Sequence, residues 1–182
     1  MQTITIKDNE AGQRLDKYLK RYFKYAEPSL LYKMLRKKNI VLNKNKVNGT
    51  EILNAGDIIN TFFSDETFAK FTGESDFDAS NNANIDTKLF ENAYSTINNI
   101  DILYEDSDFV FMSKPVGVVS QIDENNCYSI NEWLIGYLLS KDEVDFKSFK
   151  PSISNRIDRN TSGIIMAAKS YSGSRFLSDS IR

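Results

Sequence analysis

The sequence predicts an α+β fold, in which a small N-terminal helix-helix-strand unit is followed by an incomplete, mixed but mainly antiparallel β-sheet with flanking helices. Two amphipathic helical patterns near the N-terminus and several short apolar runs after residue 100 predict this arrangement. The chain has 182 residues, of which 41% are hydrophobic, enough for one ordinary domain or two small ones. We therefore expect a folded protein with two units.

Two basic helices are expected in the first 40 residues. Apolar side chains recur at helical spacing between residues 14 and 25, and Pro28 is suited to the first turn of a second helix with Leu31 and Leu35 facing a core. The remaining faces of both helices carry positive charge. The basic residues on these faces are Lys17, Arg21, Lys33, Arg36, Lys37 and Lys38.

Short strands are expected after the second helix. Residues 40–42 are apolar and β-branched or leucine, residues 43–46 read as a polar turn, and residues 47–49 begin a return strand. A further apolar strand, 58–59, follows Gly56. The first 63 residues would thus form a small domain of their own.

Charge is distributed unevenly along the chain. Residues 1–63 hold 12 Lys and Arg against 6 Asp and Glu, whereas residues 64–182 hold 11 against 19. A basic domain beside an acidic segment suggests that the first part binds polyanions, which it would do by releasing their counterions. An ordinary solvated surface explains the charge alone about equally well.

The first 63 residues resemble an S-four-type RNA-binding domain, which is named after a protein of the small ribosomal subunit. The resemblance implies that the basic face of the two helices contacts RNA phosphates and recognises shape more than base sequence. Any one of the basic side chains, taken alone, is better explained as a solvated lysine or arginine. The segments that carry the resemblance are RLDKYL at 14–19, MLRKKNIVLNKNKV at 34–47 and GDII at 56–59.

Residues 64–99 differ in character from both flanking parts. They hold 7 acidic and 2 basic residues and show little periodicity. We expect an acidic linker or surface excursion that acts as a tether.

A second unit is expected over residues 100–182. Residues 102–104 and 109–112 predict a hairpin, which the sequence Lys114-Pro115-Val116-Gly117 ends. Apolar spacing between 130 and 139 predicts a helix, and 140–152 read as a polar loop. The apolar run 164–169 predicts a buried central strand.

Composition excludes several kinds of chemistry. Histidine is absent, Cys127 is the only cysteine, and neither a GxxxxGK[ST] nor a GxGxxG motif occurs. We therefore expect no structural metal, and any catalysis must rest on carboxylates, Lys, Arg, Tyr or backbone groups. No run approaches the ~20 apolar residues that cross a bilayer, and the N-terminus lacks a secretory pattern, so we expect a cytoplasmic protein without a membrane partner.

The segment RIDRNTSG at 156–163 is the candidate catalytic motif. In an extended backbone Arg156 and Asp158 would share a face, and a nearby guanidinium would keep the carboxylate ionised as a usable nucleophile. The turn at Thr161-Ser162-Gly163 could fix the orientation of that carboxylate. Without further information, a charged loop with a structural salt bridge explains the segment at better than even odds.

The same segment resembles the HRLDRxTSG motif of pseudouridine synthases that modify large-subunit ribosomal RNA and some other RNAs. ILYEDSDFVFMSKPVGVVSQ at 102–121 resembles the second hallmark of that family, a strand pair that ends in Lys-Pro-x-Gly. The resemblance implies that Asp158 is the nucleophile, that Arg156 fills the gap left by the flipped uridine, and that Arg159 contacts phosphate or supports the local structure. It implies RNA as the partner and a reaction without a cofactor.

The sequence also departs from the family pattern. Asn155 stands where the family has histidine, and Ile157 where it has leucine. The family domain normally continues beyond the TSG strand, whereas this chain ends at Arg182, so we expect a C-terminal truncation and an inactive fragment. The rival interpretation is a noncatalytic RNA-binding protein with a degenerate synthase remnant, and a third is an interaction domain without RNA function. The sequence specifies neither the target uridine nor the oligomeric state.

Overall fold

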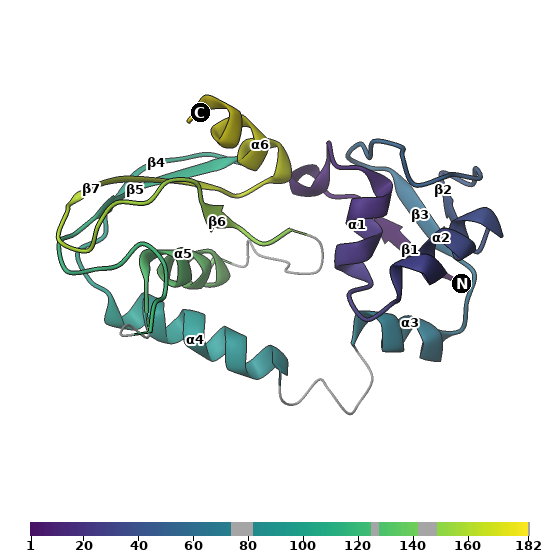
Figure 1. The fold of residues 1–182 in the computed structure, drawn as a ribbon, viewed down its shortest axis with the longest axis horizontal. Coiled ribbons are helices and arrows are strands. Elements are labelled where there is room, and N and C mark those ends of the chain that lie inside the picture. Colours follow the sequence, from purple (N-terminus) through teal and green to yellow (C-terminus); the bar gives the residue numbers. More distant parts are fainter. Residues whose placement is uncertain (74–81, 125–127, 142–148, 182) are drawn as a thin grey trace. The chain divides into compact units, whose positions relative to one another are not determined.

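The computed structural model describes residues 1–73, 82–124, 128–141 and 149–181. The chain divides into two compact units (Figure 1). The first consists of residues 1–81 with 147–149, and the second of residues 82–146 with 150–182. The α+β class predicted from the sequence is confirmed.

The sheet of the first unit has three antiparallel strands in the order β1-β3-β2. Its strands are β1 (Gln2–Thr5), β2 (Ile40–Leu42) and β3 (Ile58–Thr61). The predicted strands at 40–42 and 58–59 are confirmed, but the return strand at 47–49 is wrong, because the central β3 pairs with β2 instead. The sequence reasoning also missed β1, which occupies the other side of β3.

Helices complete the core of the first unit. The two predicted helices form as α1 (Leu15–Tyr22) and α2 (Pro28–Arg36), with proline in the first turn of α2. A short 3-10 helix, η1 (Asp8–Glu10), precedes them, and α3 (Asp65–Thr72) follows the sheet. The buried apolar side chains of α1, α2 and α3 belong to one hydrophobic cluster.

The sheet of the second unit has four strands in the order β4-β5-β7-β6, and each described pairing is antiparallel. Its strands are β4 (Ile102–Glu105), β5 (Phe109–Lys114), β6 (Ser152–Ile153) and β7 (Gly163–Ala168). The predicted hairpin and the central strand after the TSG turn are therefore confirmed.

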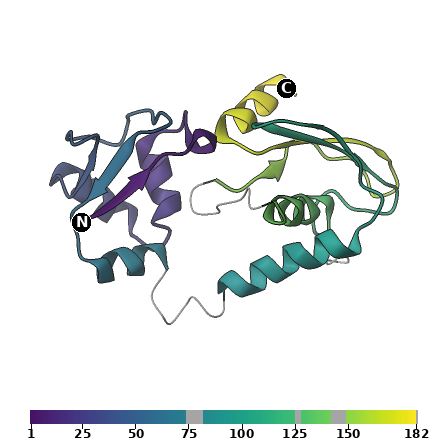
Figure 2. The ribbon, with the colours of Figure 1, turned by 180° about the vertical axis from the view of Figure 1, so that it is seen from behind.

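One face of this sheet packs on α5 (Ile130–Leu139), whose buried side chains share a cluster with those of β5 and β7. On the far side of α5 lies α4 (Asn82–Thr96), so that sheet, α5 and α4 form three layers (Figures 1 and 2). The two helices approach closely at Gly136 of α5. The last element is α6 (Tyr171–Ser180), beside the end of β7.

Residues 64–99, which the sequence predicts to be an acidic linker or surface excursion, contain two helices in their described part. Residues 65–72 and 82–96 are helical. Phe68 and Phe71 are buried in the first unit, and Phe90 and Ala93 are buried in the second. The acidic composition of the segment gave no sign of these few apolar side chains. Their buried apolar surface holds each helix on its unit.

Candidate active site and nucleic-acid interface

Lys114, the last residue of β5, joins the two loops of the candidate site. Its side chain is fully buried, at 0% exposure. Its Nζ donates to the carbonyl oxygens of Val118 at 2.7 Å, Pro115 at 3.0 Å and Arg159 at 3.4 Å. An ammonium group has three protons, and these three carbonyls can satisfy them. Lys114 thereby fixes the loop after β5 against the loop that contains Asp158.

Lys114 also lies within the electrostatic reach of Asp158. Burial lowers the pKa of Lys114, and the negative charge of Asp158 opposes that shift. Lys114 therefore places a buried positive charge within electrostatic reach of the exposed carboxylate of Asp158, without a described ion pair between them.

Further contacts connect the same two loops. The hydroxyl of Ser120 donates to the carbonyl of Ile157 at 2.7 Å and accepts the amide of Ile157 at 3.1 Å. The amide of Gly117 donates to the carbonyl of Arg159 at 2.8 Å, and Nε of Arg159 donates to the carbonyl of Gly117 at 3.1 Å. Asp158 therefore sits between two residues whose backbones are both held.

Asn155 occupies the position where the chain leaves β6 and enters the loop that contains Asp158. The β6–β7 register pairs Ile153 with Ala167, and its continuation would place the backbone of Arg156 opposite Ile164. Instead, the side chain of Asn155 takes that edge of β7: its Oδ1 accepts the amide of Met166 at 2.8 Å and its Nδ2 donates to the carbonyl of Ile164 at 3.0 Å. The side-chain amide satisfies β7, and the backbone from residue 156 onward is free to leave the sheet.

The motif residues alternate in exposure. Arg156 and Asp158 are exposed, and Ile157 between them packs partly against the core of the second unit. The expected ion pair between Arg156 and Asp158 is absent among the described residues, since the guanidinium of Arg156 donates to Oε1 of Gln121 at 3.3 Å. The amide of Thr161 donates to the backbone carbonyl of Asp158 at 3.1 Å, so it shapes the turn without contacting the carboxylate.

The sequence predicts Arg156, Asp158 and Arg159 as site residues, and in the structure all three lie on one exposed loop. The sequence did not predict that Lys114 and Ser120 support this loop. The Lys-Pro-x-Gly motif was the available signal for Lys114, because a lysine that ends a buried strand must find acceptors. Ser120 gives no comparable signal.

The six basic residues expected to contact RNA are all exposed in the first unit. Two lie on α1, two on α2 and two directly after α2. α1 and α2 pack against each other. Between them, Nζ of Lys20 lies 5.1 Å from the ring centre of Tyr32. In order, the six are Lys17, Arg21, Lys33, Arg36, Lys37 and Lys38.

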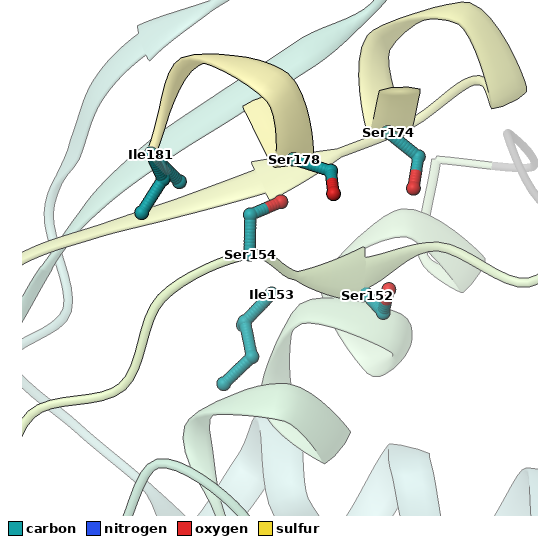
Figure 3. A pocket seen from close by; sticks show the side chains of 6 residues that line it. All are labelled: Ser152, Ile153, Ser154, Ser174, Ser178 and Ile181. Carbon is teal, nitrogen blue, oxygen red and sulfur yellow. The ribbon is translucent and has the colours of Figure 1, made fainter. Parts of the chain in front are cut away.

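A pocket of about 320 Å³ in the second unit lies between β6 and α6 (Figure 3). None of its described lining residues is charged, and none belongs to the motif at 155–163, so the pocket is separate from the candidate catalytic loop. Its lining consists of Ser152, Ile153, Ser154, Ser174, Ser178 and Ile181.

Within the described ranges, neither a membrane-crossing helix nor a metal-ligand cluster occurs. No described helix combines the length and apolar character that a bilayer requires. Likewise, no group of three or more Asp, Glu, Cys or His side chains in these ranges could hold a metal ion.

No family model matches the chain. The solved structure of human RNA pseudouridylate synthase domain containing 4 matches 54% of this chain and 34% of its own, at 19% identity and a TM-score of 0.37, which is too weak to bear on the fold.

The sequence relatives match over the whole chain. An uncharacterised RNA pseudouridine synthase of Mycoplasma capricolum is 27% identical over 100% of this chain and 55% of its own length. Ribosomal large subunit pseudouridine synthase C of Haemophilus ducreyi is 30% identical over 100% of this chain and 50% of its own length. The chain thus spans about half the length of the curated relatives that it matches. Throughout that span its sequence is similar to those of proteins named as ribosomal large subunit pseudouridine synthase C or RNA pseudouridine synthase.

Proposed function

We propose that the protein containing this sequence converts uridine to pseudouridine in RNA, with large-subunit ribosomal RNA as the substrate. The observation that carries the proposal is the loop around Asp158, which presents an exposed carboxylate from a backbone fixed on both sides. The similarity to pseudouridine synthases along the whole chain supports the same activity. A ribosomal substrate would place the protein in the cytoplasm.

Asp158 is the proposed nucleophile. The reaction breaks the bond between ribose carbon and uracil nitrogen, rotates the base and rejoins it through carbon, so no atom is gained or lost and no cofactor is required. An aspartate that forms a transient covalent bond divides this exchange into easier steps. Such a group must be held in a productive geometry, and the contacts of Lys114 and Ser120 provide that rigidity. The atom that Asp158 attacks, on ribose or on base, is left open.

Arg156 and Arg159 are proposed to contact the RNA. A base inside a helix must leave its stack to react, at a cost of a few kcal/mol, and the planar guanidinium of Arg156 can stack in the vacated space. Its hydrogen bond with Gln121 holds it near that position before RNA binds. Arg159 uses Nε for the carbonyl of Gly117, and its terminal nitrogens have no described partner, so they remain available for a phosphate.

The first unit is proposed to be the RNA-binding domain. It carries an excess of positive charge, and its basic side chains project from α1, α2 and the residues that follow α2. These side chains would contact phosphates and fix the orientation of the RNA without reading its sequence.

The test is a pseudouridine assay on ribosomal RNA with the protein in the longest form that its natural reading frame encodes. We expect conversion by the wild type and none by the Asp158→Ala variant. Asn160→Ala is the matched control, because Asn160 is exposed on the same loop and its side chain has no described partner. This control should retain activity.

RNA binding is measured in parallel at several salt concentrations. Absence of pseudouridine in every form, combined with salt-sensitive RNA binding, would replace the proposal with a noncatalytic RNA-binding protein. An RNA affinity that does not change with salt concentration would contradict RNA binding by the first unit.

A further inference from the structure

A second pocket, of about 370 Å³, lies on the first unit along one side of α2. It combines an aromatic ring, two positive charges, a hydroxyl and a side-chain amide, which together match the parts of a nucleotide: a flat base, a phosphate and polar edges. α2 supplies most of its lining, and the loop before β3 supplies the rest. The lining residues are Ser29, Tyr32, Lys33, Leu35, Arg36 and Asn48.

Tyr32 is half-exposed, and its ring is held at the hydroxyl end. Its hydroxyl donates to Oδ2 of Asp16 at 2.9 Å. Asp16 is buried in α1, and Arg14 also donates to both of its carboxylate oxygens at 3.1 Å. Burial raises the pKa of Asp16, but the hydrogen bonds from Tyr32 and Arg14 outweigh it and lower the pKa overall. The acceptor therefore stays ionised, and the ring stays fixed.

The loop opposite the ring is also fixed. Gly49 has φ +98°, and a Cβ there would lie 3.2 Å from Cβ of Asp16 and 3.6 Å from Cε1 of Tyr32. The carboxylate of Glu51 accepts the amides of Gly49 at 2.7 Å and Asn48 at 2.8 Å. Because both of its carboxylate oxygens accept backbone amides, Glu51 holds the loop.

Positive charge surrounds the ring. Lys33 and Arg36 are exposed, and neither forms an ion pair with any described residue. Nζ of Lys20 lies 3.4 Å from the hydroxyl of Tyr32, on the side of α1. A fixed aromatic ring flanked by uncompensated cations is the arrangement by which proteins bind a single-stranded base and its phosphate.

We infer that this pocket binds one unpaired nucleotide of the RNA, with the base stacked on Tyr32 and a phosphate between Lys33 and Arg36. The inference rests on the proposed RNA binding by the first unit and adds a preference to it. A paired base inside a duplex has both faces covered by neighbouring bases, so it cannot stack on a protein ring. The first unit therefore prefers RNA with an unpaired residue over a duplex of the same charge.

The experiment compares two RNAs with the full chain. One is a hairpin with 2-aminopurine in its loop, and the other is a blunt duplex with the same number of phosphates and the probe in a base pair. Binding is followed by anisotropy, and stacking by the change in 2-aminopurine emission. The variants are Tyr32→Leu, which removes the ring, and Tyr32→Phe, which keeps the ring and loses the hydrogen bond to Asp16.

Tyr25→Leu is the matched control. Tyr25 is an exposed tyrosine of the same unit, and Nζ of Lys24 lies 4.8 Å from its ring centre, but it does not line the pocket. Circular dichroism of each variant checks that the unit is folded.

We expect the wild type to bind the hairpin about tenfold more tightly than the duplex, the effect of one stacked base. Tyr32→Leu should lose this preference and the emission change, whereas Tyr32→Phe and Tyr25→Leu should keep both. Equal binding of the two RNAs by the wild type, or an unchanged preference in a folded Tyr32→Leu variant, would overturn the inference and leave RNA binding intact. Failure to bind either RNA would instead reject the proposed RNA-binding role of this unit, and the inference with it.

Discussion

The hydroxyl of Ser120 forms two hydrogen bonds with Ile157, donating to its carbonyl at 2.7 Å and accepting its amide at 3.1 Å. The two residues are 37 positions apart, and the contact joins the loop after β5 to the residue before Asp158. Because the side chain of Ile157 packs toward the core, both its backbone and its side chain are held. Asp158 is thereby presented from a fixed point.

Replacing Ser120 with alanine should loosen this loop. Ser120→Ala leaves the amide and carbonyl of Ile157 without their partner, and we expect a loss of about 1–3 kcal/mol in the free energy of unfolding. Urea denaturation followed by the fluorescence of Trp133, the only tryptophan, measures this loss in the second unit. Hydrogen exchange of residues 155–159 should be faster in the variant.

Ser152→Ala is the control for this change, because Ser152 is exposed and its hydroxyl has no described partner. It should match the wild type in both measurements. Equal exchange rates in wild type and Ser120→Ala would show that the loop is held without this hydroxyl.

The side-chain amide of Asn155 should be required for its contacts with β7. Asn155→Asp keeps the shape of the side chain and the oxygen that accepts the amide of Met166. It removes the donor to the carbonyl of Ile164 and places a carboxylate oxygen against that carbonyl oxygen. We expect a loss of about 1–3 kcal/mol in the stability of the second unit, from the unsatisfied carbonyl and the repulsion.

The same chemical change at Asn160, which is exposed and has no described side-chain partner, should alter stability by less than about 0.5 kcal/mol. The two variants are compared by urea denaturation at neutral pH. An equal effect at both positions would mean that the contacts of Asn155 with β7 contribute nothing.

Local pattern predicted much of the fold. The helix that begins at Pro28 and the hairpin of β4 and β5 depend on residues close in sequence, and both form as expected. The return strand at 47–49 does not form, because β3, beginning at Ile58, pairs with β2 instead. Strand pairing is decided by the partner that buries the apolar face, and the sequence of a single strand does not contain that information.

The candidate site was predictable only in part. Asp158 and its neighbours form a continuous motif, and the structure places them together on one loop. The supports of that loop come from Lys114 and Ser120, which lie about 40 residues earlier and meet it only in the folded sheet. Asn155 shows the same limit: its departure from the family pattern was visible, but its bonds to β7 depend on the β6–β7 register.

Gly136 should be required for the packing of α4 on α5. A Cβ at this position would lie 2.2 Å from the backbone oxygen of Phe90 and 2.8 Å from Cβ of Tyr94. Gly136→Ala must push the helices apart, and we expect a loss of about 1–3 kcal/mol despite the better helix propensity of alanine. The stacked rings of Trp133 and Tyr137 adjoin this contact, so the emission of Trp133 should also change.

This prediction tests the placement of residues 82–96 in the second unit. If that segment were a free tether, Gly136→Ala would stabilise α5 by up to about 1 kcal/mol, because alanine favours helix more than glycine. The sign of the change in a thermal or urea unfolding curve therefore distinguishes a packed α4 from a tether.

Glu105 should make the second unit sensitive to acid. Its carboxylate accepts the hydroxyl of Tyr137 at 2.7 Å and the ammonium groups of Lys141 and Lys169 at 2.9 Å each. Burial raises the pKa of Glu105, but hydrogen bonds from Lys141, Tyr137 and Lys169 outweigh it and lower the pKa from 4.5 to about 2. The folded state therefore binds this proton less readily than the unfolded state does.

The sign of the pH dependence follows from this difference. The stabilisation by Glu105 is fully present above pH 4.5, and it is lost as the pH falls from 4.5 to about 2. We expect Glu105 to contribute about 1–2 kcal/mol after screening by solvent, because the lysines lie near the surface. Urea denaturation monitored through Trp133 at a series of pH values measures this contribution.

Other carboxylates also titrate in this range, so the variant must be compared with the wild type at each pH. Glu105→Gln should be less stable than the wild type at pH 6, and the difference should shrink toward pH 2. Glu91→Gln is the control, because Glu91 is exposed on α4 without a described partner, and its difference from the wild type should stay near zero. A constant difference for Glu105→Gln across this range would mean that the two lysines do not hold the carboxylate in its ionised form, and that the loss comes from packing alone.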